Sequence, residues 1–102
     1  MNSKNRTRII LSIAVVFCAC SPALYMPTMD DANHTGGSVD SLMIGRALYT
    51  NHCGSCHNLH LPERYTRTQW EKVIQEMKPK AKITDKEALL ISKFLLARSK
   101  PE

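Results

Sequence analysis

The clearest hydrophobic pattern in the chain lies in the segment TQWEKVIQEM, residues 68–77. Its apolar side chains recur at the spacing of one helix face: Trp70, Val73, Ile74 and Met77. Thr68 stands three residues before Glu71, which is the spacing of a capping box at a helix start. Pro79 disfavours the α conformation at the residue before it, so we expect this helix to end at Met77.

Two further segments have helical patterns. DSLMIGRALYTNH, residues 40–52, offers Asp40 or Ser41 as an N-cap, and TDKEALLISKFLLARSK, residues 84–100, opens with a capping box. Gly45 costs about 1 kcal/mol relative to alanine within the first of these helices. Either another helix approaches closely at this glycine, or it is a tolerated surface residue.

The domain formed by residues 38–102 is therefore predicted to be all-α, with three to four helices. No segment carries a convincing strand pattern, and no internal repeat is visible. A domain of this size buries little apolar surface, so its stability needs support from something other than its own core. We expect a cofactor to fill the centre.

The N-terminal residues have the organisation of an export signal. A basic start is followed by an apolar run from Ile9 to Ala19, which is too short for a membrane-spanning helix of about 20 residues. Residues 1–19 are predicted to be a signal peptide. The segment that ends at Cys20 resembles the lipobox of bacterial lipoproteins, although Phe17 and Cys18 depart from the usual residues.

This resemblance implies that Cys20 becomes a lipidated N-terminus. A soluble secreted product and an uncleaved anchor are the alternatives. Residues 20–37 contain two prolines, paired acids and paired glycines without a sustained period, and we interpret them as a flexible tether. It would reach roughly 60 Å when extended, so the domain could swing away from its anchor. The alternative is that the segment Leu24 to Met26 docks on the domain.

Charge and cysteine content change once the signal is removed. The whole chain has 14 basic and 9 acidic residues, and loss of Lys4, Arg6 and Arg8 leaves 11 basic residues against 9 acidic ones. A nucleic-acid-binding function then has no electrostatic basis. With Cys18 removed and Cys20 lipidated, two of the four cysteines remain for chemistry.

These two cysteines, Cys53 and Cys56, stand in the segment NHCGSCHNLH, residues 51–60. Cys-x-x-Cys-His is the attachment signature of haem c. When the segment coils helically, the two sulfurs lie on one side and can bind the two vinyl groups of one porphyrin, while His57 can ligate the iron. A thioredoxin-like dithiol needs alternating strands and helices, and a zinc site needs a fourth good ligand. We therefore predict one covalent haem c.

Residues 41–97 resemble a small class I cytochrome c of the bacterial monohaem type. The resemblance rests on Gly45 and Tyr49 before the attachment motif and on the aromatic-Leu pair Phe94-Leu95 in the last helix. In that family the first and last helices cross at the glycine and the aromatic residues. The proline that accepts a hydrogen bond from the proximal histidine has no clear counterpart, since Pro62 is only the nearest one.

The distal iron ligand is predicted to be Met77, because it is the only methionine after the motif. Alternatively, Met77 is simply the last core residue on the apolar face of its helix. His52 and His60 are the competing candidates for the distal ligand. We expect Trp70 and Ile74 to contact the haem with Met77 in one apolar cleft. The Trp70 indole would either donate its N–H to a haem propionate or pack against the ring.

The predicted function is electron transfer by a periplasm-facing carrier, held to a bacterial membrane by its lipid and not itself an enzyme. Its partners would be a redox protein donor and acceptor, with no small-molecule substrate. The sequence does not decide whether this membrane is the inner or the outer one. A haem-based sensor or small-ligand binder and an electron-transfer subunit of a larger oxidoreductase are the alternatives. Four lysines form either a basic docking surface or a solvated face: Lys78, Lys80, Lys82 and Lys86.

Overall fold

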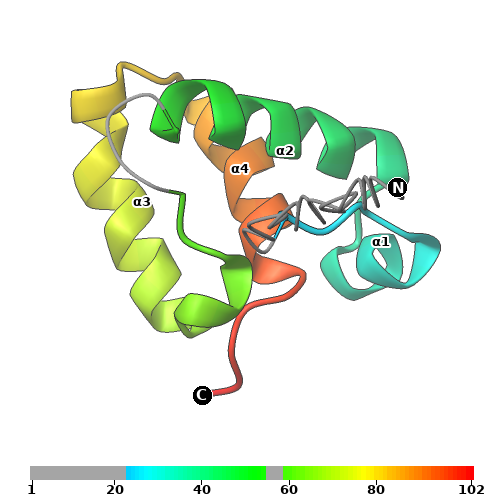
Figure 1. Cartoon of the computed structure of the whole chain (residues 1–102). Helices are drawn as coiled ribbons and strands as arrows, with labels where there is room; N and C mark the ends of the chain where they lie inside the picture. Colours follow the sequence, from blue (N-terminus) through cyan, green and yellow to red (C-terminus); the bar gives the residue numbers. More distant parts are fainter. Residues whose placement is uncertain (1–22, 55–58) are drawn as a thin grey trace, which may run out of the picture.

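The computed structural model describes residues 23–54 and 59–102. Within these ranges the chain is helical, as expected (Figure 1). The elements in chain order are α1 (Met29–Thr35), α2 (Val39–Cys53), the short 3-10 helix η1 (Pro62–Arg64), α3 (Arg67–Ala81) and α4 (Asp85–Leu96). The described part has no β-strand beyond an isolated bridge between Thr66 and Lys100.

Helices α2 and α4 cross in close contact at Gly45. A Cβ atom at this position would lie 2.9 Å from the carbonyl carbon of Leu90 and 3.1 Å from the Cβ of Phe94. The second distance is tighter than ordinary packing, and the first would force the backbone of α4 to move. The close helix approach predicted at Gly45 is confirmed, and it takes place beside the fully buried Phe94.

Each α-helix that the structure describes begins at a capping box, although the N-caps of α2 and α3 differ from the predicted ones. The cap of α4 at Thr84 is confirmed. The cap of α2 is Ser38, which exchanges hydrogen bonds with Ser41. The cap of α3 is Thr66, because Gln69 completes its box, whereas Thr68 donates a hydrogen bond from its hydroxyl to the Glu102 carboxylate at 2.9 Å.

Helix α3 also ends later than predicted, because it continues through Pro79 to Ala81. A proline this close to the C-terminal end removes only one intrahelical hydrogen bond. Lys82 closes the helix in the left-handed conformation, with φ of 54°, and donates its N–H to the Lys78 carbonyl. This turn buries Ile83 in the core, and that burial outweighs the local preference against helix before proline.

The expectation of a flexible tether is wrong for residues 23–37. Tyr25 stacks on Phe94, with 4.6 Å between the ring centroids and 7° between the ring planes. The alternative, in which this segment docks on the domain, therefore holds for Tyr25. Helix α1 follows with its own capping box, and Asp31 is bound by the Arg98 guanidinium at 2.9 Å. The signal peptide and Cys20 lie outside the described residues.

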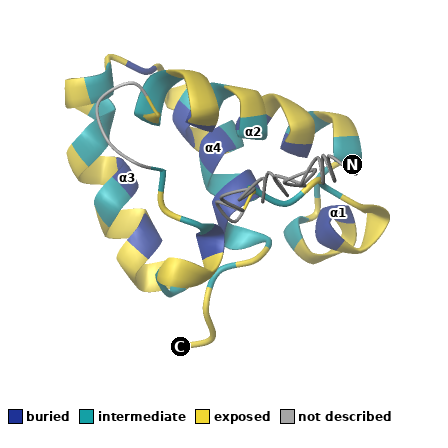
Figure 2. Cartoon of the chain, in the orientation of Figure 1, coloured by how far each residue is buried: buried dark blue, intermediate teal, exposed yellow. Residues whose placement is uncertain are grey.

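The core lies where α2, α3 and α4 face one another. Figure 2 shows their buried residues turned inward and their exposed residues on the outer faces. The largest fully buried side chains are Leu42, Pro62, Trp70, Ile91, Phe94 and Leu95. None of the helices in residues 23–54 and 59–102 is long and apolar enough to cross a membrane.

Candidate functional site

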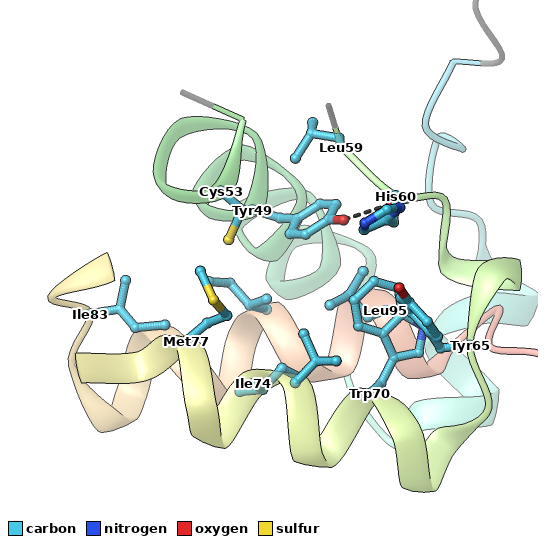
Figure 3. Close-up of a pocket in the computed structure, with 12 residues that line it drawn as sticks. Tyr49, Cys53, Leu59, His60, Tyr65, Trp70, Ile74, Met77, Ile83 and Leu95 are labelled. Carbon is cyan, nitrogen blue, oxygen red and sulfur yellow. Dashed lines mark hydrogen bonds between the residues drawn. The ribbon is translucent and has the colours of Figure 1, made fainter. Parts of the chain in front are cut away.

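An apolar cavity of about 200 Å³ lies between α2 and α3, with α4 as its floor (Figure 3). Its lining includes every apolar residue of the predicted α3 stripe and reaches the loop after α2. The lining residues are Tyr49, Cys53, Leu59, His60, Tyr65, Trp70, Val73, Ile74, Met77, Ile83, Ile91 and Leu95. None of these twelve residues carries a carboxylate, an ammonium or a guanidinium group. The cavity therefore suits a large apolar group.

Cys53 brings a thiol to this cavity from the last turn of α2. Its side chain is half-buried, and Figure 3 shows the sulfur turned into the space between α2 and α3. Burial raises the pKa of the Cys53 thiol, which keeps it protonated and uncharged. Cys56 and His57 lie outside the described residues, but Leu59, two residues after His57, lines the same cavity.

Met77 contributes a second sulfur from the opposite wall. Together with Trp70 and Ile74 it lines the cavity from α3, so the predicted apolar cleft is present. Figure 3 shows the Met77 thioether directed into the same space as the Cys53 sulfur. Ligation by Met77 and contact of Trp70 and Ile74 with a cofactor stay predictions.

Trp70 uses its indole N–H within the protein. The Nε1 atom donates a hydrogen bond of 2.7 Å to the Pro62 carbonyl, and the indole is buried. Tyr49 and Tyr65 pack edge-on against it, with ring centroids 6.2 Å and 5.0 Å away. The indole N–H is therefore already bound to a backbone carbonyl instead of being free for a haem propionate, and packing of Trp70 against the haem ring stays a prediction. The indole joins α3 to η1 and so shapes the cavity wall.

The two histidines near the motif differ in position. His60 lines the cavity, and its carbonyl accepts a hydrogen bond of 2.6 Å from the Tyr49 hydroxyl. Burial raises the pKa of Tyr49, so this hydroxyl stays a proton donor. His52 lies 3.3 Å from the Glu87 carboxylate and does not line the cavity. Of the two competing ligands, only His60 lines the cavity.

Comparison with known proteins identifies the family of this chain. Residues 49–102, just over half of the chain, match the family model described as dihaem cytochrome c. The chain belongs to the dihaem cytochrome c family. No curated protein and no solved structure matches it.

Membership of the dihaem cytochrome c family establishes a c-type cytochrome domain, whose cofactor is covalently bound haem c and whose activity is electron transfer. Redox proteins are accordingly its partners. The expectation of a monohaem family was wrong, because this family is named for two haems. The sequence nevertheless contains a single Cys-x-x-Cys-His motif, at Cys53 to His57.

The residues that line this cavity fit a haem. The cavity is apolar and partly aromatic, one attachment cysteine opens into it, and a thioether stands across from that cysteine. Its volume of about 200 Å³ is below the 300 to 1,000 Å³ of typical ligand pockets. A bound haem would therefore widen the cavity or leave one edge outside it, where a redox partner can approach.

Sequence patterns did not identify several of the lining residues. Leu59 and Tyr65 belong to the irregular loop between α2 and α3, where no period distinguishes inward from outward side chains. Their short distance in sequence from the motif is the signal that could have found them. Ile83 was hidden for another reason, since its burial depends on the unexpected extension of α3 through Pro79.

Proposed function

We propose that this chain is a membrane-tethered electron carrier that holds one haem c through Cys53 and Cys56, with His57 and Met77 as axial ligands. The observation that carries this proposal is the apolar cavity in which Cys53 and Met77 face the same space from opposite walls. The single Cys-x-x-Cys-His motif supports the count of one. The haem supplies one-electron chemistry by cycling between ferrous and ferric iron.

The protein contributes an environment for this electron transfer. Apolar side chains from α3 and α4 would cover much of a bound haem, and this burial favours the less charged form of a redox centre. A thioether ligand from Met77 raises the reduction potential relative to a two-histidine site. Trp70 and Tyr49 hold the intervening loop by hydrogen bonds to backbone carbonyls, so the cavity wall has a defined shape.

Exposed lysines lie near the turn between α3 and α4. Lys80, Lys82 and Lys86 are exposed, whereas Lys78 forms an ion pair with Asp85. Because Met77 and Ile83 line the cavity near this turn, these lysines support docking of an acidic redox partner. The lipid anchor at Cys20, facing the periplasm, would keep the carrier near membrane-bound partners.

The axial ligand is tested with Met77→Ala. We expect the ferric protein to lose its weak near-infrared sulfur-to-iron band and to bind added ligands. Met43→Ala is the matched control, because this partly exposed methionine lies on α2 and does not line the cavity. An unchanged band in Met77→Ala would place the sixth ligand elsewhere, with His60 as the first candidate.

Two measurements on the purified full-length protein test the remaining parts. Intact-mass spectrometry should show one haem per chain and an acylated N-terminus at Cys20. Two haems, or an unmodified soluble chain, would contradict the corresponding part of the proposal. Carbon monoxide should bind slowly or not at all to the ferrous protein, because Met77 closes the sixth position. Prompt binding would instead indicate a sensor or ligand-binding protein.

A further inference from the structure

The N-terminal segment is attached to the domain close to the proposed lipid site. Tyr25 stacks on Phe94 and donates its hydroxyl proton to the Phe94 carbonyl. The Arg46 guanidinium donates to the Tyr25 carbonyl at 3.1 Å, and the Arg98 guanidinium lies 4.3 Å from the centre of the Tyr25 ring. Chain segments from both α2 and the end of α4 thus hold this tyrosine.

A second attachment follows six residues later, at Asp31 in the first turn of α1. Arg98 binds both oxygens of the Asp31 carboxylate, at 2.9 and 3.1 Å, and the backbone N–H and hydroxyl of Thr28 donate to the same carboxylate. Asp31 is 6% exposed, so its charge is largely removed from water and needs these partners. We call residues 24–35 the strap.

The strap leaves little free chain between the domain and a lipid on Cys20. Leu24, the first strap residue, is four residues from Cys20, and four extended residues span at most about 14 Å. A tether that ran free to Ser38 would reach roughly 60 Å. The attached strap therefore keeps the domain within about 14 Å of the lipidated residue and limits its rotation.

Exposed apolar side chains on the strap fit this placement. Among the residues that the structure describes, the two most exposed large hydrophobic side chains are Met29, at 67%, and Met26, at 57%. Both lie within nine residues of Cys20. An apolar side chain held this close to a bilayer can enter its interface, which accounts for two methionines that the core does not use.

The strap and the cavity lie on different sides of the domain. Figure 1 shows α1 on one side of α4 and α3 on the other. The cavity is lined by α3 and by the inner faces of α2 and α4, and no residue of the strap lines it. With the strap against the lipid, the cavity stays accessible from the side away from the anchor.

We infer that the strap is a membrane-contact surface that holds the domain on a lipid bilayer in one orientation, with the haem cavity turned away from the lipid. This inference rests on the proposed lipidation of Cys20 and on the proposed haem. The domain would then not swing on a free tether, and it would exchange electrons with partners at a fixed height above the membrane.

The test uses the acylated haem protein in oriented phosphatidylcholine multilayers. We expect the electron paramagnetic resonance signals of the ferric haem to change with the angle between the membrane and the magnetic field. A variant with a flexible insert of about 14 Gly and Ser residues after Ser21 gains a tether of about 20 Å and should lose most of this angular dependence. The insert leaves the strap contacts intact, so folding is not at risk.

A second variant, Tyr25→Ala with Asp31→Ala, releases the strap itself and should lose the angular dependence to a similar extent. Its haem absorption and circular dichroism verify that the domain is folded. Angular dependence that persists when the strap is released in the double variant would overturn the inference, as would its absence in the unaltered protein. Failure of the proposed function is distinguishable, because the protein would then lack haem absorption or fail to join the multilayers.

Discussion

The side of α4 that faces α2 and the strap differs from the side that faces α3. On the first side, Gly45 allows the two helix backbones to meet, Tyr25 stacks on Phe94 and Arg98 neutralises the buried Asp31. On the second side, α3 stands off from α2, and an apolar cavity of about 200 Å³ separates them. One side is completed by the chain's own contacts, and the other needs an additional group.

This difference has an energetic consequence. Haem that covers the apolar walls of this cavity would contribute about 25 cal/mol for each Å² removed from water, which is a substantial share of the stability of a small domain. The side with α3 is therefore the part of the domain that depends on haem. The side with α2, α4 and the strap has the contacts to persist without it.

The largest expected effect comes from removing haem attachment with Cys53→Ala and Cys56→Ala together. We expect the free energy of unfolding to fall by several kcal/mol, because nothing fills the cavity. Hydrogen exchange should accelerate most in α3 and in residues 59–66, and least at the crossing of α2 with α4. Equal acceleration in all helices would show that the two sides are not independent, and a sharp, unshifted thermal transition would contradict the dependence on haem.

The next effect comes from Gly45→Val at the crossing itself. The new side chain would meet the Leu90 carbonyl and Phe94, so we expect a loss of about 3 kcal/mol in stability. Ala47→Val is the matched control, because Ala47 is exposed on the same helix and the change there costs only about half a kcal/mol. Thermal unfolding of both variants measures the difference. Similar melting temperatures for the two would mean that the crossing is not a tight contact.

The same contrast decides how much could be predicted from the sequence. The helices and the α3 stripe follow from periods and caps, which are local signals. The close contact at Gly45 was one of two alternatives, suggested by the cost of a glycine within a helix. The attachment of Tyr25 to Phe94 joins residues that are 69 positions apart. Nothing in the composition of residues 20–37 reveals such a partner, and their prolines and glycines favour an irregular segment.

The cavity was predicted in part for a similar reason. Trp70, Ile74 and Met77 were found because a helix face reports which side chains point inward. The hydrogen bond from Trp70 to Pro62 was not foreseen, because loop carbonyls carry no sequence signal. The number of haems shows a different limit of sequence reasoning. One Cys-x-x-Cys-His motif predicts one haem for this chain, whereas its family is named for two haems.

A pH titration probes the strap side. The Arg98 guanidinium and the Thr28 donors lower the pKa of Asp31 from 3.8 to about 2. Because the folded-state pKa is depressed, the stabilisation is complete above about pH 4 and is lost as the pH falls toward 2. We expect about 1 to 2 kcal/mol, allowing for the partial exposure of Arg98 to solvent.

The measurement compares the wild-type protein with Asp31→Asn, so that other carboxylates cancel. Their difference in free energy of unfolding should be constant from pH 7 to 4 and should shrink below pH 4. A difference that is independent of pH down to 2 would mean that the ion pair does not stabilise the fold.

The smallest effect separates the two sides most directly. Tyr25 and Tyr49 each donate a hydroxyl proton to a backbone carbonyl, of Phe94 on the strap side and of His60 on the cavity side. Tyr25→Phe and Tyr49→Phe should each cost about 1 kcal/mol, because one carbonyl loses its donor while the ring stays in place. Only Tyr49→Phe should also shift the haem absorption bands and the reduction potential, because the loop that the Tyr49 hydroxyl holds at His60 lines the cavity. An equal spectral change in Tyr25→Phe would show that contacts behind α4 reach the cavity, and the division between a self-sufficient side and a haem-dependent side would then fail.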